Sequence, residues 1–224
     1  MLRHARGKHE RSPPLRFPNA HEGVKKIFTA EILMIIVTIG TVIVSGISMS
    51  GNRSEGAIGA AAIILVAAGV ISIIAFIMNL LGIIQARKDE QQFTYALYAV
   101  IGGIVASLVQ SAFPNNGLVV DAANTVSSIC SALATYYVIG GILNLAEQLG
   151  NADMIAKGKR ARIIVVTLWL IVVILQLLGT IFGTGNDTLM LIESVLLVAA
   201  GVLSIILYFV YLSYLSKART MLGQ

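Results

Sequence analysis

The fold is decided by the stretch from Ala57 to Gln85, which reads AIGAAAIILVAAGVISIIAFIMNLLGIIQ. It contains no charged side chain. It is also longer than the about 20 apolar residues that an α-helix needs to cross the hydrocarbon core of a bilayer. A strand of a membrane β-barrel would instead alternate apolar and polar residues. The stretch therefore predicts a transmembrane helix.

Comparable apolar stretches lie on both sides of it, separated by short polar connections. The turns at Pro114–Gly117 and Thr184–Asp187 are so tight that they can join only antiparallel neighbours. The sequence therefore predicts an all-α integral membrane protein: a bundle of six transmembrane helices within residues 23–224. The other five predicted spans are Ile27–Ser50, Phe93–Phe113, Leu118–Ala146, Ile163–Gly183 and Thr188–Lys217.

The composition agrees with a lipid environment. Hydrophobic residues make up 57% of the chain and charged residues only 12%, with a mean hydropathy of +0.86, whereas a soluble domain carries about 25% charged residues. The histidines lie at or before His21, and the single cysteine, Cys130, lies in an apolar run. The apolar part thus offers no ligand set for zinc, haem or copper, and we expect no cofactor. No Walker A, HExxH or GxSxG signature occurs, so we do not expect an enzyme.

The basic residues predict the orientation. Of the 16 lysines and arginines, all except Arg53 fall before Ile27, in the connections Ala86–Gln92 and Glu147–Arg162, or at the C-terminal end. Positively charged loops stay in the cytoplasm. This predicts a multi-pass protein with both termini cytoplasmic, and the compact chain with short loops is typical of a bacterial inner membrane.

The N-terminal tail, residues 1–22, combines prolines with basic residues and is predicted to be disordered. The net charge of +5 favours contact with anionic lipid headgroups at the cytoplasmic face. Nucleic acid is not an expected partner, because the basic residues are not interleaved with aromatic ones. The sequence leaves open whether the chain works with further copies of itself or with a partner membrane subunit.

An internal repeat runs through the chain. The segment LVAAGVISII at residues 65–74 recurs as LVAAGVLSII at residues 197–206. Three acids at the predicted outer starts of the second, fourth and sixth spans, Glu55, Asp121 and Asp187, are equally spaced. These matches predict three helical hairpins related by a pseudo-threefold axis along the membrane normal. The alternative is chance similarity between helices that draw on few residue types.

Charged groups within a bilayer are costly, so each one is a candidate functional residue. Glu193 lies inside the predicted last span, where the corresponding residue of the first hairpin is Ala61. It is therefore a candidate to bind a proton or a cation; the alternative is a structural carboxylate at the outer interface. Glu31 follows Lys25 and Lys26, and we expect it to form an interfacial ion pair with them or with other cytoplasmic cations.

A polar stripe on the predicted fourth span is the second candidate. Its residues are spaced by three or four positions, which places them on one face of a helix. The stripe either lines a polar path through the membrane or holds neighbouring helices together through hydrogen bonds. Two glutamines on the third and fifth spans are candidates to join it. The stripe comprises Asp121, Asn124, Ser128, Ser131 and Thr135, and the glutamines are Gln110 and Gln176.

Two classes of function follow from these patterns. The first is a small transporter, channel or transporter subunit for an ion or small solute; the second is a membrane scaffold or stress-associated protein without a solute path. The six short-looped helices are similar in architecture to the substrate-binding subunits of energy-coupling-factor transporters. However, Ile27–Ser50 lacks the Ala-x-x-x-Ala pattern with which those subunits dock to their partner.

Overall fold

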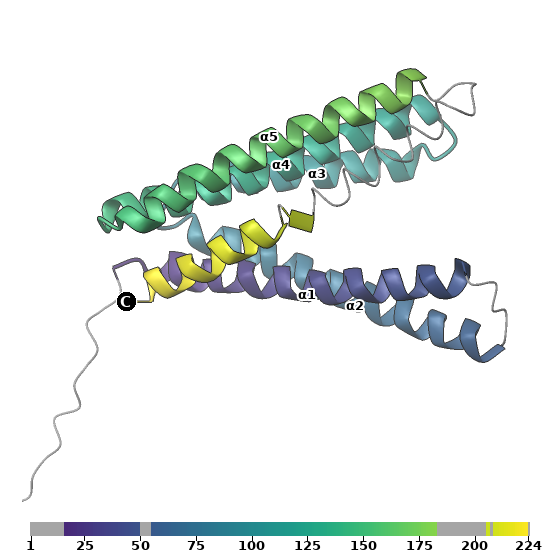
Figure 1. Ribbon diagram of the computed structural model, residues 1–224, viewed down its shortest axis with the longest axis horizontal. Helices are drawn as coiled ribbons and strands as arrows, with labels where there is room; N and C mark the ends of the chain where they lie inside the picture. The colour runs from purple at the N-terminus through teal and green to yellow at the C-terminus, as the bar shows by residue number, and fades with distance from the viewer. Residues whose placement is uncertain (1–15, 50–54, 183–204, 207, 224) are drawn as a thin grey trace, which may run out of the picture.

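The structure is a computed structural model that describes residues 16–49, 55–182, 205–206 and 208–223 (Figure 1). Within these residues the regular secondary structure is entirely α-helical. Residues 205–206 and 208–222 are also helical and are called the C-terminal segment below. The longer helices are α1 (Pro18–Met49), α2 (Glu55–Ala86), α3 (Gln92–Ala112), α4 (Gly117–Gln148) and α5 (Ala152–Phe182).

Four of these helices, α1 to α4, are long and apolar enough to cross a membrane. The all-helical architecture of the described residues confirms the predicted fold class, and four such helices agree with the predicted multi-pass membrane protein. The pairs α1–α2 and α3–α4 each form an antiparallel hairpin. The third hairpin involves residues 183–204, outside the described part of the chain, so the six spans and the threefold repeat stay predictions.

Two helices begin earlier than the hydropathy pattern predicts. Helix α1 begins at Pro18 and not at Ile27, so residues 18–22 are helical and do not belong to a disordered tail. Helix α5 begins at Ala152 and not at Ile163, which turns most of the predicted basic loop into helix. The hydropathy pattern predicts only the part of a helix that contacts lipid. A helix can extend beyond that part if one of its faces packs against the rest of the protein.

In α5 that buried face is formed by Met154, Ala161 and Val165, each only 3% exposed. Their spacing follows the helical period, which is the signal that the hydropathy reading missed. The preceding turn from α4 is made by Gly150, whose φ of 67° lies in the left-handed region that favours glycine.

The helices form two layers that meet at one end. Helices α1 and α2 lie side by side in one layer, and α3, α4 and α5 form the other, with the C-terminal segment between them (Figure 1). The layers come together where α2 leads into α3 and move apart toward the opposite end. We call these the packed end and the divergent end.

The hydrophobic core lies at the packed end. Ala20, Ile27, Phe93, Leu145 and Leu215 are completely buried and belong to one cluster that joins both layers to the C-terminal segment. At the divergent end and on the outer faces, large apolar side chains are exposed: Leu118 is 85% exposed and Ile63 is 72% exposed. Exposed apolar surface of this extent fits contact with lipid.

Helices α1 and α2 touch through their backbones. A Cβ atom at Gly23 would lie 2.5 Å from the carbonyl oxygen of Gly82, and a Cβ atom at Gly82 would lie 2.7 Å from that of Gly23. Small residues allow this close approach, which supplies van der Waals packing where lipid gives helices no hydrophobic reason to associate.

Side chains from the connections tie the packed end together. The Asp89 carboxylate accepts hydrogen bonds from the backbone N–H of Ala20 at 2.8 Å and from the Asn19 amide at 2.9 Å, so it caps the N-terminus of α1. Arg16 donates to the carbonyl of Gln148 at the end of α4, at 2.8 Å. The α2–α3 and α4–α5 connections thus lie beside the start of α1.

The described C-terminal end lies there as well. The imidazole of His21 is so near Gly223 that a Cβ atom at the glycine would lie 2.9 Å from the histidine Cε1. The described basic segments therefore gather at the packed end, as the charge pattern predicts. That this end faces the cytoplasm stays a prediction.

Candidate membrane cavity

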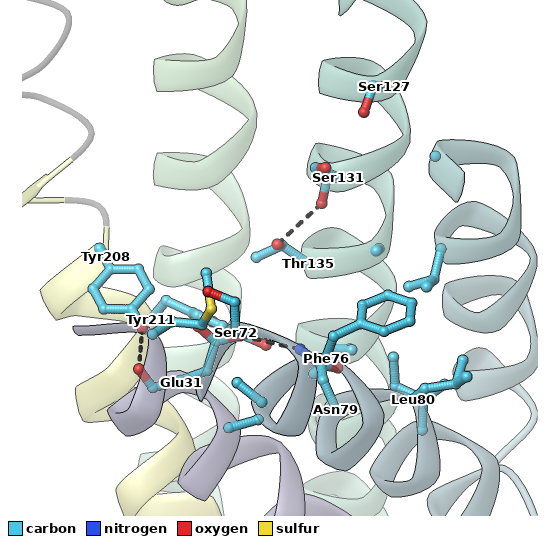
Figure 2. Close-up of a pocket in the computed structure, with 18 of the residues that line it drawn as sticks. Glu31, Ser72, Phe76, Asn79, Leu80, Ser127, Ser131, Thr135, Tyr208 and Tyr211 are labelled. Atoms are coloured by element: carbon cyan, nitrogen blue, oxygen red, sulfur yellow. Dashed lines mark hydrogen bonds between the residues drawn. The ribbon is translucent and has the colours of Figure 1, made fainter. Parts of the chain in front are cut away.

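A cavity of about 1060 Å³ lies between the α1–α2 hairpin and the α3–α4 hairpin, and the C-terminal segment contributes to its wall (Figure 2). Its size matches the pockets of about 300–1000 Å³ that hold small molecules. Apolar side chains make up most of the wall, and the polar groups are few. We call it the Glu31 cavity, because Glu31 is the only acidic or basic side chain among the described residues that line it.

Glu31 is half-buried and held by neighbouring helices. The Asn79 amide of α2 donates to its carboxylate at 3.4 Å, and the Tyr208 hydroxyl of the C-terminal segment donates to its backbone carbonyl at 2.5 Å. Both hydrogen bonds are drawn in Figure 2. The carboxylate therefore stands where α1, α2 and the C-terminal segment meet.

The expected ion pair of Glu31 with Lys25 or Lys26 is wrong. Lys25 lies 3.9 Å from Glu22, and Lys26 donates to Gln85 at 2.5 Å. Five and six residues along a helix bring a side chain to a different face, which is why these lysines do not reach Glu31. Among the described residues, Glu31 makes no ion pair.

Hydroxyl groups line the opposite wall. Ser127, Ser131 and Thr135 follow one another along α4, as Figure 2 shows, and Ser107 and Ser111 lie on α3. Thr135 donates to the Ser131 carbonyl at 3.1 Å, and Ser107 and Ser111 each donate to the carbonyl four residues earlier at 3.0 Å. In Thr135, Ser107 and Ser111 the hydroxyl donor is satisfied by the helix backbone, so the oxygens of these three hydroxyls remain as acceptors along the cavity.

Aromatic rings complete the wall near the carboxylate. Phe76 of α2 and Phe209, Tyr208 and Tyr211 of the C-terminal segment line the same cavity as Glu31. An aromatic face attracts a cation through its quadrupole. A single carboxylate among aromatic and aliphatic side chains can bind a positively charged group that is attached to an apolar body.

The cavity contains part of the polar stripe predicted on the fourth span. Ser131 and Thr135 line it, together with Ser127. Asp121 and Asn124 are exposed near the start of α4, at the divergent end, and do not line the cavity. Both residues lie farther along α4 toward the divergent end than the lining residues Ser131 and Thr135, so their side chains do not reach the cavity.

The remaining predicted site residues do not reach the cavity or fall outside the description. Ser128 and Gln110 are half-buried and do not line it. Gln176 lies on α5, but its side chain is outside the part of the structure that is described, and so is the whole of Glu193. The cation-binding hypothesis for Glu193 therefore stays untested.

The pairing of Glu31 with Asn79 was not predicted, although the sequence holds a signal for it. In the α1–α2 hairpin, Gly23 packs against Ala86, and Gly82 packs against Ile27. Continuing this antiparallel register by one helical turn brings Glu31 to the level of Met78 and Asn79. Two polar residues at facing positions of two apolar helices therefore indicate a polar site between the helices.

A second polar contact lies nearer the packed end. Arg162, predicted as a loop residue, belongs to α5, and its guanidinium lies 3.8 Å from the ring centroid of Tyr136 on α4. The contact is a cation–π interaction that joins the two helices.

Comparison with protein-family models, with curated proteins and with solved structures finds no match. The function is therefore argued from the cavity itself.

Proposed function

We propose that this chain is a small membrane transporter, or a transmembrane subunit of one, that binds a positively charged small solute at Glu31. The observation that carries the proposal is a half-buried carboxylate on the wall of a large cavity between two hairpins, without a cationic partner among the described residues. The proposal keeps the six spans, the cytoplasmic termini and the inner-membrane location predicted from the sequence, and it assigns no enzymatic activity.

The electrostatics of the cavity favour a cation. A carboxylate away from water is costly unless a positive charge or several hydrogen-bond donors compensate it. The Asn79 amide offers a single long hydrogen bond, at 3.4 Å. A bound cation supplies the missing charge, and this makes its affinity depend on Glu31.

The shape of the wall narrows the class of solute. Apolar and aromatic side chains surround the carboxylate, whereas a site for a bare metal ion needs several oxygen ligands close together. The hydroxyls of Ser131 and Thr135 lie on the other hairpin. We therefore expect an organic cation whose apolar body lies against Phe76 and Phe209.

A path to the cavity follows from the arrangement of the layers. The layers are packed together at the basic end and move apart at the other (Figure 1), and we propose that a solute enters from the divergent end. Transport then requires the two hairpins to rock about the cavity and open the packed end, as in alternating access.

The alternative is a scaffold without a solute path. The hydrogen bond from Asn79 to Glu31 joins α1 to α2, and hydrogen bonds of this kind hold membrane helices together in proteins that transport nothing. In that case the charge of Glu31 has no effect on flux.

A flux assay in proteoliposomes separates the two functions. Efflux of tetraphenylphosphonium, a lipophilic cation, is compared for the full chain, for Glu31→Gln and for Asp121→Asn, which removes an exposed acid outside the cavity. We expect Glu31→Gln to lower efflux at least about tenfold, equivalent to about 1.4 kcal/mol of binding, and Asp121→Asn to leave it unchanged. Equal efflux from wild type and Glu31→Gln would sink the proposal.

Two further measurements sharpen the assay. Glu193→Gln tests the carboxylate predicted from the sequence under the same conditions. Efflux of K⁺ tests the class of solute: if K⁺ leaves faster than tetraphenylphosphonium in a manner that depends on Glu31, the solute is an inorganic ion and the organic-cation assignment is wrong.

A further inference from the structure

A second hollow, of about 480 Å³, lies between α5 and the C-terminal segment. Three basic residues line one end of it: Lys157 and Arg160 from α5 and Lys217 from the C-terminal segment. Apolar residues, among them Ile164 and Ile206, line the rest. We call it the basic groove.

Charge and hydrophobicity are separated along the length of the groove. The two elements run antiparallel, so Lys157 and Lys217 lie at its end toward the packed end of the molecule, and Ile164 and Ile206 lie deeper. From Lys217 to Ile206 the helical rise is roughly 16 Å, at 1.5 Å per residue. An amphipathic molecule of about that length, with an anionic head, matches the groove.

The positive charge of the groove is only partly neutralised. Asp153 pairs with Lys157 on the exposed face of α5. The hydrogen bond from Lys157 holds the pKa of Asp153 below its usual value, so this carboxylate is charged at neutral pH. In the described part of the chain, Arg160 and Lys217 form no ion pair, although the charge of Lys217 also helps to lower the pKa of Asp153.

A polar group inside the groove also lacks a partner. Tyr214 is 4% exposed and lines the groove, and its hydroxyl makes no hydrogen bond within the described residues. Its ring packs closely on α5: a Cβ atom at Gly158 would lie 2.6 Å from the Tyr214 hydroxyl oxygen. A buried hydroxyl without a partner is costly, and the Tyr214 side chain that carries it lies in the wall of the groove.

We propose that the basic groove binds one anionic phospholipid, with its phosphate between Arg160 and Lys217 and an acyl chain along Ile164 and Ile206. The groove lies where the predicted span of α5 begins, at Ile163, which is the level of the headgroups. Basic pockets between helices at this level are typical sites for anionic headgroups. The site is independent of the Glu31 cavity and of the transport function proposed for it.

Native mass spectrometry of the full chain in detergent tests the lipid. Phosphatidylglycerol, phosphatidylcholine and inorganic phosphate are added in separate series, and we expect one retained phosphatidylglycerol per chain with neither of the others. Retention of phosphatidylcholine to the same extent, or of inorganic phosphate alone, would show that the groove does not recognise an anionic lipid.

Matched variants test the position of the site. The double variant Arg160→Gln with Lys217→Gln is expected to weaken phosphatidylglycerol binding at least tenfold. The double variant Arg87→Gln with Lys88→Gln removes the same charge from the exposed α2–α3 connection and is expected to leave binding unchanged. Equal loss in both pairs would mean that the lipid responds only to total charge and that the groove is not its site.

A gain-of-affinity variant covers the case in which the double variant fails to fold. Asp153→Asn frees Lys157 from its carboxylate partner and is expected to tighten phosphatidylglycerol binding severalfold. Unchanged or weaker binding in this variant would contradict the proposal even if the loss variants cannot be purified.

Discussion

The packed end and the divergent end hold their helices in different ways. At the packed end the backbones of α1 and α2 touch through Gly23 and Gly82. Farther along the same two helices, a Cβ atom at Gly46 or Gly69 would meet no atom of another element within 4 Å among the described residues. Within that part of the chain, glycine therefore allows close packing at one end, whereas at the other end these two glycines contact no neighbouring helix.

The difference suggests that the packed end stabilises the fold, whereas the region around the Glu31 cavity serves function. Tight backbone contacts and polar caps concentrate the folding energy at the packed end, and the Glu31 cavity lies beyond them, where the layers begin to separate. A region with few contacts can move at low cost. The predictions below test this division, beginning with the largest effect.

Replacing the glycine at the backbone contact is expected to have the largest effect. Gly82→Leu forces a branched side chain against the Gly23 carbonyl oxygen, which would lie 2.7 Å from its Cβ atom. Because backbone atoms cannot move aside, we expect the free energy of unfolding to fall by about 3 kcal/mol. Titration of the protein in mixed micelles with sodium dodecyl sulfate measures the change.

Gly69→Leu is the matched control on the same helix. Among the residues that the structure describes, no atom of another helix would lie within 4 Å of its Cβ atom, so we expect a change within about 0.5 kcal/mol. A loss equal to that of Gly82→Leu would show that the two ends contribute alike to stability.

Loss of the cap on α1 is expected to have the next largest effect. Asp89→Ala removes both hydrogen bonds to the start of α1, and we expect a loss of about 1–2 kcal/mol. Hydrogen exchange should show faster opening of residues 18–22 in this variant. Asp121→Asn, at the divergent end, serves as the control, and unchanged exchange in Asp89→Ala would exclude a capping role.

The carboxylate in the cavity is expected to oppose stability mildly. Glu31→Gln keeps a hydrogen-bond acceptor for Asn79 but removes a half-buried charge, so we expect a stability gain of about 1 kcal/mol together with the loss of flux. Thermal unfolding in detergent measures the first effect. A clear loss of stability would instead favour the scaffold function, in which Glu31 serves only to hold helices together.

The exposed Asp153–Lys157 pair is expected to have the smallest effect, visible only at extreme pH. The pKa of Asp153 is lowered by its hydrogen bond with Lys157, so its contribution is present above about pH 4, the usual range of the carboxyl group, and is lost as the pH falls below that. The same hydrogen bond raises the pKa of Lys157, so that contribution is lost only as the pH rises above about 10.4. In Asp153→Asn, the parts of the acid and alkaline decreases in unfolding temperature that come from this pair should disappear. An unchanged pH profile of the unfolding temperature would mean that the pair does not contribute to stability.

Much of the architecture followed from local patterns. The apolar runs predicted α1 to α4 with boundaries close to those observed, except at Pro18, where a helix extends beyond the lipid-facing residues. The start of α5 differs from the prediction for the same reason, because Met154 and Ala161, which precede the predicted span, are buried on one face of the helix. Hydropathy alone does not contain that information.

The candidate site was predicted only in part. Ser131 and Thr135 were identified because their spacing places them on one helix face, but Glu31 was assigned to an ion pair that does not form. Glu31 is close to Lys25 and Lys26 in the sequence, which suggested an ion pair. On the helix, however, these lysines lie on a different face from Glu31. The partner of Glu31 lies on another helix, and only the register between α1 and α2 reveals it.

The sequence by itself determined that α1 to α4 are long and apolar enough to cross a membrane and that the described basic segments share one end, since both properties depend on the composition of continuous segments. Only the tertiary structure decided that Glu31 meets Asn79 and Tyr208 in a cavity and that Arg160 meets Lys217 in a groove. These pairings depend on the rotation and register of helices far apart in the chain, which the order of apolar residues along one helix does not specify.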